Sequence, residues 1–263
     1  MSSLSACIQG IGLLGPGFDS WPAGTRVLQS EAAYRPERTV LPQAQMLPAA
    51  ERRRAGRVIR LALAVGQEAV SAADADAHTL VTVFSSSGGD GDNCNQICAT
   101  LASADRQLSP TRFHNSVHNA ASGYWGIAYG CQSPSTALCA HDASFGAGLL
   151  EALAQLAAGA ERVLLLAYDL DYPPPLHAKR PITDAFGVGL VLAAPTAAAA
   201  PRLHLSLSAA PAQRLPDAQL EALRTQVPAA RCLPLLQLLA RRQPGRVLID
   251  YLDRVSMALE VEL

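Results

Sequence analysis

The chain has 263 residues, of which 49% are apolar and 16% are charged, and its formal net charge is −1 at pH 7. A chain of this length can bury a large core, and its low charge content favours a well-buried α/β protein or one that buries extra surface against a partner. The near-neutral charge balance argues against a protein that binds nucleic acid or another polyanion.

The cysteines and the termini limit the compartment and the chemistry. The six cysteines form no CxxC pair, and their spacing predicts neither a disulfide framework nor a zinc ligand set. The first residues lack the basic region of a secretory signal, and no stretch approaches the roughly 20 apolar residues of a membrane span. We therefore expect a cytoplasmic protein without a metal ion or another cofactor.

In chain order, the apolar pattern predicts strands that alternate with helices. The expected strands are residues 6–14, 79–85, 136–140, 162–167, 185–193, 202–208, 246–251 and 256–262. The expected helices are residues 51–73, 93–102, 119–129, 143–153, 217–226 and 233–242. The longer expected loops are residues 18–50, which include one short helix, the polar segment 108–118 and the proline-rich segment 168–179. This alternation is typical of a parallel or mixed sheet that is covered by helices on both faces.

The chain divides into a long first part and a short second part. Residues 1–195 carry most of the strands and helices, and residues 196–263 contain a smaller set. An alanine-rich linker over residues 195–201 joins them. We expect the two parts to form one compact domain.

The expected helix 51–73 begins with four arginines, Arg52, Arg53, Arg54 and Arg57. The helix dipole disfavours positive charge at a helix N-terminus. These side chains are therefore expected to form a solvated basic face, and the alternative is a patch for an acidic partner.

Residues 135–153 have the pattern of a turn that holds a nucleophile. An apolar run turns sharply at His141 and Asp142 and continues as a helix of small residues. Many α/β enzymes place a nucleophile at such a helix N-terminus, where negative charge is favoured. Here neither Ser nor Cys lies at the turn. We predict that Asp142 caps the helix by accepting from the N–H groups of Ser144 or Phe145; an acid–base role together with His141 is the alternative.

Cysteine could replace the missing nucleophile. Cys139 lies three residues before Asp142, but it is expected to be buried within the strand, as structural cysteines commonly are. Cys131 and the pair Cys94 and Cys98 are likewise interpreted as packing residues. A nucleophilic role for Cys139 remains the alternative.

The loop SSSGGDGDN over residues 85–93 favours a close approach of two backbones. It has neither the lysine and glycine spacing of a phosphate-binding loop nor a calcium-loop pattern. We expect Gly88 and Gly89 to allow close packing at an interface between protomers. A Ser/Asp site or a cradle for a cation or phosphate is the alternative.

Polar and aromatic residues follow one another over residues 114–125. His114, Asn115 and His118 lie in one polar loop, and no third metal ligand is near the two histidines in sequence. They are predicted to order the loop by hydrogen bonds or to line a partner's cavity. Tyr124 and Trp125 are predicted to anchor the core or an interface, because aromatic side chains dominate buried contacts.

Five segments occur in the order found in the first half of a β-ketoacyl synthase. They are GIGLLGPG, FSSSGGDGD, SPTRFHNSVHNAASGYWGIAYG, PSTALCAHDASFGAGLLEAL and DAFGVGLVLA. The chain resembles a β-ketoacyl synthase of the thiolase fold over residues 6–194, and more narrowly the chain length factors of bacterial aryl polyene gene clusters.

The resemblance also shows what this chain lacks. Active ketosynthases carry the acylated cysteine in a pattern such as ACxSG, and aligning PSTALCAHDASFG with it places Asp142 at the cysteine position. They also carry two histidines and a lysine in the second half, whereas this chain has only His204 and no lysine after Pro201. The resemblance therefore implies that no residue is catalytic.

The resemblance implies an α/β, thiolase-like fold of layered helices and sheets with a complete first half and an abbreviated second half. It implies a non-catalytic chain length factor that forms a heterodimer with an active ketosynthase and shapes its acyl cavity. Such type II polyketide synthase systems make polyene or fatty-acid-like chains. The acyl carrier protein would bind the partner and contact this chain only indirectly. The implied interface or cavity residues are His114, Asn115, His118, Tyr124, Trp125 and Phe145.

Two other functions stay open at this point. The chain could be a stand-alone thiolase-like acyltransferase or thioester hydrolase that uses Cys139, or Asp142 with His141. It could also be a scaffold that forms a homodimer when isolated and has no acyl role.

Overall fold

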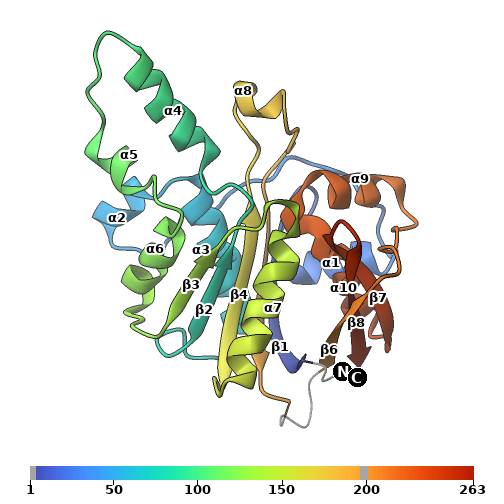
Figure 1. Ribbon diagram of the computed structural model, residues 1–263. Helices are drawn as coiled ribbons and strands as arrows, with labels where there is room; N and C mark the ends of the chain where they lie inside the picture. The colour runs from blue at the N-terminus through green and yellow to red at the C-terminus, as the bar shows by residue number, and fades with distance from the viewer. Residues whose placement is uncertain (1–3, 196–200) are drawn as a thin grey trace.

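A computed structural model of the chain describes residues 4–195 and 201–263, so most of the expected linker lies outside the described residues. The strands within these ranges form one mixed sheet in the order β3-β2-β4-β5-β1-β6-β8-β7 (Figure 1). The strands are β1 (Leu4–Leu14), β2 (Val81–Ser85), β3 (Ser135–Leu138), β4 (Arg162–Asp169), β5 (Phe186–Ala193), β6 (Arg202–Ser208), β7 (Gly245–Leu252) and β8 (Val255–Glu262). Strand β2 pairs in parallel with β3 and β4, and all other pairs are antiparallel.

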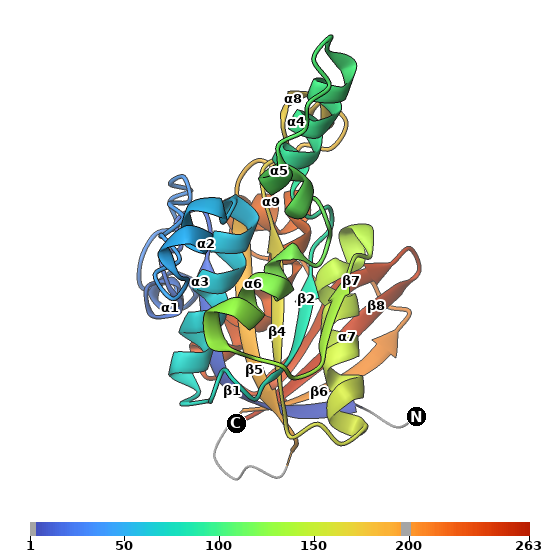
Figure 2. The same cartoon turned by 90° about the vertical axis from the view of Figure 1, so that its left-hand side faces the viewer.

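The helices cover the sheet on both sides. They are α1 (Trp21–Leu28), α2 (Ala49–Arg54), α3 (Arg57–Ala72), α4 (Gly91–Ala102), α5 (Pro110–His114), α6 (Ala120–Tyr129), α7 (Ser144–Ala157), α8 (Pro174–His177), α9 (Ala218–Gln226) and α10 (Leu233–Arg241), with 3-10 turns η1 (His141–Ala143) and η2 (Pro228–Cys232). Helices α3 and α6 lie on one face, and α7 lies on the other (Figure 2). This is the layered α/β arrangement that the alternation of elements predicts.

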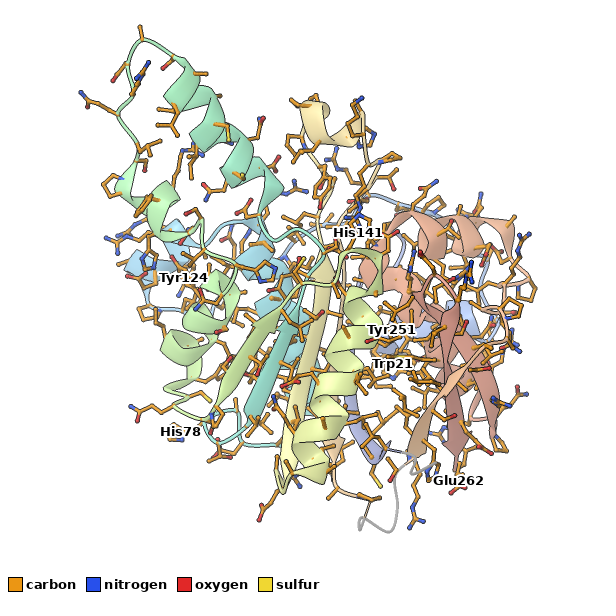
Figure 3. All side chains as sticks on the ribbon, viewed as in Figure 1. Trp21, His78, Tyr124, His141, Tyr251 and Glu262 are labelled. Atoms are coloured by element: carbon orange, nitrogen blue, oxygen red, sulfur yellow. The ribbon has the colours of Figure 1, made fainter. Side chains whose placement is uncertain are left out.

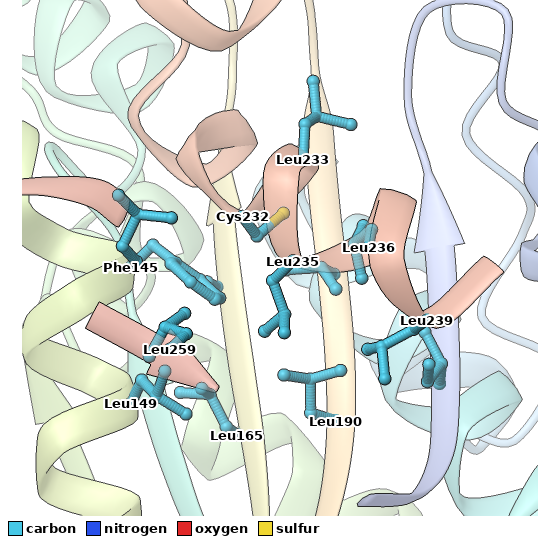
Figure 4. Packing of buried hydrophobic residues seen from close by; sticks show 14 of the residues in the cluster. Phe145, Leu149, Leu165, Leu190, Cys232, Leu233, Leu235, Leu236, Leu239 and Leu259 are labelled. Atoms are coloured by element: carbon cyan, nitrogen blue, oxygen red, sulfur yellow. The ribbon is translucent and has the colours of Figure 1, made fainter. Parts of the chain in front are cut away.

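The two faces have separate cores. The core beneath α7, η2 and α10 contains Phe145, Leu149, Leu165 and Leu235, which interdigitate between the helices and the sheet (Figure 4). The core beneath α3 and α6 contains Trp125, which is 1% exposed. Strands β4 and β5 supply side chains to both cores, and this explains why they are almost continuously apolar.

Glycine allows α3 to lie directly on β1. A Cβ atom at Gly12 would lie 2.0 Å from the carbonyl oxygen of Val65, and one at Gly10 would lie 2.1 Å from that of Ala69. No side chain fits between the two backbones at these points. The broken glycine pattern of the first strand therefore records a close helix–sheet contact.

The strands of the second part continue the same sheet. Strand β6 pairs with the start of β1, and β8 and β7 follow outward. The helix-covered face of these strands is apolar, whereas their outer face carries the cross-strand row His204, Glu260 and Arg246. Glu260 and Arg246 are opposite charges placed side by side across two strands, and such pairs stabilise a face that is open to water.

The expected helix 51–73 is in fact two helices, and this prediction was wrong. Helix α2 ends at Arg54, Gly56 precedes α3, and the chain is extended between them. Arg52, Arg53 and Arg54 consequently lie in the last turn of α2, where the helix dipole favours positive charge. The apolar pattern belongs to α3 alone, since no residue of α2 is buried, and the prediction missed the extended residues Ala55 and Gly56 between the two helices.

The structure differs from the predicted elements in three loop regions and in one helix. The expected loop 108–118 contains α5, β4 continues through Asp169 into the expected proline-rich loop, and that loop contains α8. On α7 the buried face includes the large side chains of Phe145, Leu149 and Leu153, although the sequence predicted a helix of small residues. In the described part of the chain, no helix has the length and apolar character required to cross a membrane.

Candidate functional site

The turn before α7 lies at the carboxyl end of the central strands. Strand β3 ends at Leu138, and the chain turns through η1, where His141 has a left-handed backbone with φ of 51°. The hydroxyl of Ser144 accepts a hydrogen bond from the N–H of Ala140 at 3.1 Å and donates one to the carbonyl of His141 at 2.7 Å. Ser144 therefore stabilises the sharp turn that the sequence predicted.

Asp142 does not cap α7, so that prediction was wrong. Its carboxylate accepts hydrogen bonds from the guanidinium groups of Arg180 and, at 3.2 Å, of Arg231. Within the described residues, no side chain hydrogen-bonds to the first N–H groups of α7. Two charged donors bind a carboxylate more strongly than neutral backbone N–H groups do, and they draw it away from the helix axis.

His141 lies beside Asp142 but faces the solvent. Its Nδ1 is 3.5 Å from the Asp142 carboxylate, and its side chain is 73% exposed (Figure 3). A pocket of about 840 Å³ opens here, between the turn and the β7–β8 hairpin. Its other charged lining residues are Arg231, Asp250, Asp253 and Arg254.

A buried carboxylate beneath this turn joins distant parts of the chain. Asp169, at the end of β4, accepts hydrogen bonds from the N–H and hydroxyl of Ser87 at 2.8 and 2.6 Å and from the N–H of Ala229 at 2.8 Å. Burial raises the pKa of Asp169, although these hydrogen bonds oppose the shift. The sequence analysis missed this residue because it placed Asp169 in a loop; a polar residue that ends a buried strand was the available signal.

The loop 85–93 packs against its own chain. A Cβ atom at Gly88 would lie 2.0 Å from the hydroxyl oxygen of Tyr172, so a close approach occurs here within the chain; packing of this loop between protomers stays a prediction. Gly89 has a left-handed backbone with φ of 59°. Asp90 caps α4 by accepting from the N–H of Asn93 at 3.0 Å.

The residues of the segment 114–118 lie at different depths. Asn115 is buried, donates to the carbonyl of Arg54 at 2.8 Å and accepts from the hydroxyl of Tyr124 at 3.2 Å. His114 contacts the ring of Tyr124 edge-on, and the Nε2 of His118 is 3.3 Å from the carbonyl oxygen of Ser86. Asn115 and His118 thus make hydrogen bonds that order the segment, whereas His114 makes a ring contact; the role of the two histidines at a partner's cavity stays a prediction.

The predicted aromatic anchors belong to the core of this chain. Tyr124 and Trp125 are each 1% exposed, and Trp125 contacts Tyr129, with 4.3 Å between their ring centroids. Phe145, in the first turn of α7, is fully buried in the core. Only His114 and His118 of the six residues expected at an interface or cavity are well exposed.

Three cysteines expected to be buried are exposed. Cys94 and Cys98 lie on the outer side of α4, and Cys139 follows the end of β3 rather than lying within it. The Sγ atom of Cys139 donates to the carbonyl of Ser87 at 3.1 Å, and no histidine within the described residues hydrogen-bonds to it. Cys131 is half-buried and donates to the carbonyl of Leu80 at 3.4 Å.

The site offers carboxylates and guanidinium groups rather than a metal-ligand set. Over residues 4–195 and 201–263, no three His, Cys, Asp or Glu side chains converge as metal ligands would. At the turn itself, the one anion is already bound to two cations. This arrangement favours a structural ion pair over a free nucleophile or base.

Comparison with known proteins gives one family match and several similar structures. The family model described as "Beta-ketoacyl synthase, N-terminal domain" matches residues 26–247. No curated protein matches the chain.

Similar solved structures cover the whole chain. A chain of the complex of the ketosynthase ApeO with its chain length factor ApeC from Xenorhabdus doucetiae is 22% identical, with a TM-score of 0.75 over 98% of this chain and 99% of that one. The ishigamide ketosynthase/chain length factor gives 14% identity and a TM-score of 0.72, covering 98% of this chain and 99% of that one. The complex AntDE:AntF, a type II PKS acyl-carrier protein with its ketosynthase bound to the hexaketide, gives 13% identity and a TM-score of 0.76, covering 99% of each chain. At these identities the likeness establishes the fold.

Proposed function

The chain belongs to the β-ketoacyl synthase family, and from this premise we propose that it is a non-catalytic subunit, a chain length factor, that pairs with an active ketosynthase. The observation that carries the proposal is Asp142 at the position of the acylated cysteine, with its carboxylate bound by Arg180 and Arg231. An acyl group on a carboxylate would be a mixed anhydride, which is too labile for a resting intermediate. A thiolate is the nucleophile that this chemistry needs.

The second part of the chain supports the same conclusion. His204 is its one histidine, and this part contains no lysine. The Nε2 atom of His204, on β6, lies 3.5 Å from the carboxylate of Glu262, on β8, and Figure 3 shows Glu262 at the end of the molecule opposite His141. His204 therefore lies far from the turn and does not replace a catalytic histidine.

The free edge of the sheet supports pairing with a partner. The carbonyls of Pro134 and Leu138 accept hydrogen bonds from β2, so the backbone groups of Ser135 and Ala137 between them point to the other side of β3. Within the described residues no strand pairs with that side. An unpaired edge of this kind is a template for a strand from another chain.

Exposed apolar side chains lie on the same side of the molecule as this edge. Phe113 and Val117 are 67% and 54% exposed on the segment that leads to α6, and Ile127 is 47% exposed on α6 itself. Helices α4 and α5 form an arm that extends from the body beside them (Figures 1 and 2). Apolar groups clustered beside an open strand edge are typical of a protein–protein interface.

The names of the similar structures suggest what the partner does. They describe a ketosynthase in complex with its chain length factor and an acyl-carrier protein in complex with its ketosynthase. For the present protein, the partner would be an active ketosynthase that builds a polyene or fatty-acid-like product. Side chains of the arm and of segment 114–118 would help to close its acyl cavity, and the carrier protein would dock through the partner.

Acyl labelling of the complex tests the proposal. The chain is co-expressed with a ketosynthase from the same genome, and the purified complex is incubated with an acyl-carrier thioester. Intact-protein mass spectrometry should find the acyl group on the ketosynthase alone. An acyl adduct on this chain, at Cys139 or Asp142, would contradict the proposal and favour the stand-alone acyltransferase. A stable homodimer that fails to bind any ketosynthase would favour the scaffold.

A further inference from the structure

The loop between β4 and β5 carries α8 at its tip and extends from the same end of the sheet as the arm (Figure 1). Its base is held firmly, because Asp171 binds Arg57, Ile182 is fully buried, and the N–H of Thr39 donates to Asp184 at 3.1 Å. The base would therefore keep its place without any help from the tip.

The tip, residues 173–181, is held differently. Its backbone hydrogen bonds are local, and His177 binds the carbonyl of Ile182 within the same loop. Among the described residues, the Arg180–Asp142 pair is the single hydrogen bond or ion pair that joins the tip to another segment. Apart from Pro173, which is buried beside Gly91 at the start of the tip, the tip is thus linked to the body by one ionic contact.

Two arginines from distant segments meet at this carboxylate. The side chains of Arg180 and Arg231 are 22% and 16% exposed, whereas that of Asp142 is 44% exposed. Arg231 belongs to η2, whose Ala229 is bound by the buried Asp169. Two guanidinium groups this close repel one another unless an anion lies between them.

We propose that Asp142 is a positioning residue: its carboxylate completes an anion site formed by Arg180 and Arg231 and thereby holds the tip of the α8 loop against the body. The residue at the nucleophile position then has a structural task. The proposal goes beyond the proposed function and does not depend on it, because the isolated chain contains every group involved.

The chain contains a built-in probe of this loop. Lys179 is its only lysine, is exposed, and is adjacent to Arg180. Endoproteinase Lys-C therefore cuts the chain at one bond, between residues 179 and 180. When opening is fast relative to cleavage, the cleavage rate follows the population of the open tip.

The experiment compares initial Lys-C cleavage rates of the full chain, made without lysine in any tag. Asp142→Ala should be cleaved about 10- to 100-fold faster than the native chain, the range expected from losing hydrogen bonds to a charged group. Asp142→Asn should also be cleaved faster, because it keeps the shape and loses the charge. Asp253→Ala, which alters the same pocket at an acidic residue that binds no other described side chain, should match the native rate.

Chemical rescue separates an anion site from simple loosening. Formate or acetate should slow the cleavage of Asp142→Ala, and chloride at equal ionic strength should not. Hydrogen exchange of the same variant should rise in residues 173–181 and stay unchanged in β4 and β5. A native cleavage rate for Asp142→Ala, a rate insensitive to formate, or exchange that rises equally throughout the sheet would each overturn the proposal.

Discussion

The two edges of the sheet are treated in opposite ways. At β3 the outward backbone groups of Ser135 and Ala137 have no strand beside them within the described residues. At β7 the edge is blocked, because the N–H of Gln213 donates to the carbonyl of Leu248 at 2.9 Å and its side-chain oxygen accepts from the N–H of Leu248 at 3.4 Å. Gln213 thus binds both the N–H and the carbonyl of Leu248, in the middle of β7.

The faces next to these edges differ in the same sense. Strands β6, β8 and β7 carry charges of both signs, such as those of Glu260 and Arg246, together with the exposed Leu207 and Leu252, whereas the exposed residues Phe113 and Ile127 lie near β3. Proteins block strand edges that must stay single, since an open edge invites pairing. The difference indicates that the sheet is covered at β7 and open at β3, the edge at which we propose that a partner pairs.

The largest expected effect is at the residue that ties the two regions together. Asp169→Ala removes the acceptor for Ser87 of the first part and Ala229 of the second, and it leaves buried N–H groups without partners. We expect a loss of about 3 kcal/mol or more in the free energy of unfolding, measured by urea denaturation.

Asp169→Asn is the matched variant. The asparagine side chain keeps one oxygen acceptor, which can face either Ser87 or the N–H of Ala229, while its amide group faces the other. This variant should therefore be destabilised by less than Asp169→Ala. If the two regions unfolded separately in the native chain, the hydrogen bonds of Asp169 would not couple them, and the comparison would describe two independent units.

The next effect is at the open edge. Ala137→Pro removes an outward N–H while leaving the hydrogen bonds of Pro134 and Leu138 to β2 in place. Binding to the ketosynthase should weaken about tenfold to a hundredfold, measured by calorimetry. Ala137→Ser, which keeps the N–H, should bind as the native chain does. Equal binding by both variants would show that the partner does not pair with β3.

Much of the fold could be predicted, because it depends on local pattern. The alternation of Met257, Leu259 and Val261 predicts strand β8. The family match over residues 26–247 confirms the family that the resemblance suggested. Helix α3 was predicted from its apolar face, although its start was placed six residues too early.

The candidate site could be located but not constructed from the sequence. Asp142 was identified at the turn, yet its partners Arg180 and Arg231 are 38 and 89 residues away in the chain. A capping residue is a local choice, whereas an ion pair depends on how distant segments pack. The same limit hid Asp169 and Gln213, whose partners are equally remote in sequence.

A smaller effect is expected at the blocked edge. Gln213→Ala frees the N–H of Leu248 and should cost about 1 kcal/mol in the free energy of unfolding. It should also allow weak self-association at high concentration, measured by sedimentation velocity, because β7 becomes a template for a second copy. Gln237→Ala, on α10, is a control for loss of a glutamine. If Gln213→Ala instead abolished binding to the ketosynthase, the roles assigned to the two edges would be reversed.

The smallest effect tests how the blocked edge responds to acid. Glu221 accepts two hydrogen bonds from Arg224, which also binds Asp250 of β7, and it accepts from the N–H of Leu215 at 2.9 Å, two residues from Gln213. The hydrogen bonds from Arg224 lower the pKa of Glu221 from its ordinary value of 4.5. Its contribution to stability is therefore present above that value and lost as the pH falls through the lower pKa of the folded state.

The contribution of Asp169 to the pH dependence of stability has the opposite sign. Because burial raises its pKa from 3.8, the folded state binds that proton more tightly, and stability falls as the pH rises from below 3.8 through the raised pKa. Glu221→Gln should flatten the loss of stability below about pH 4.5 by less than about 1 kcal/mol, whereas Asp169→Asn should steepen it. Glu31→Gln, at an exposed carboxyl, is the control, and unfolding free energies between pH 3 and 7 are the measurement. If the dependence of the unfolding free energy on pH changed in the same direction in both variants, Asp169 and the blocked edge at Glu221 would not titrate separately.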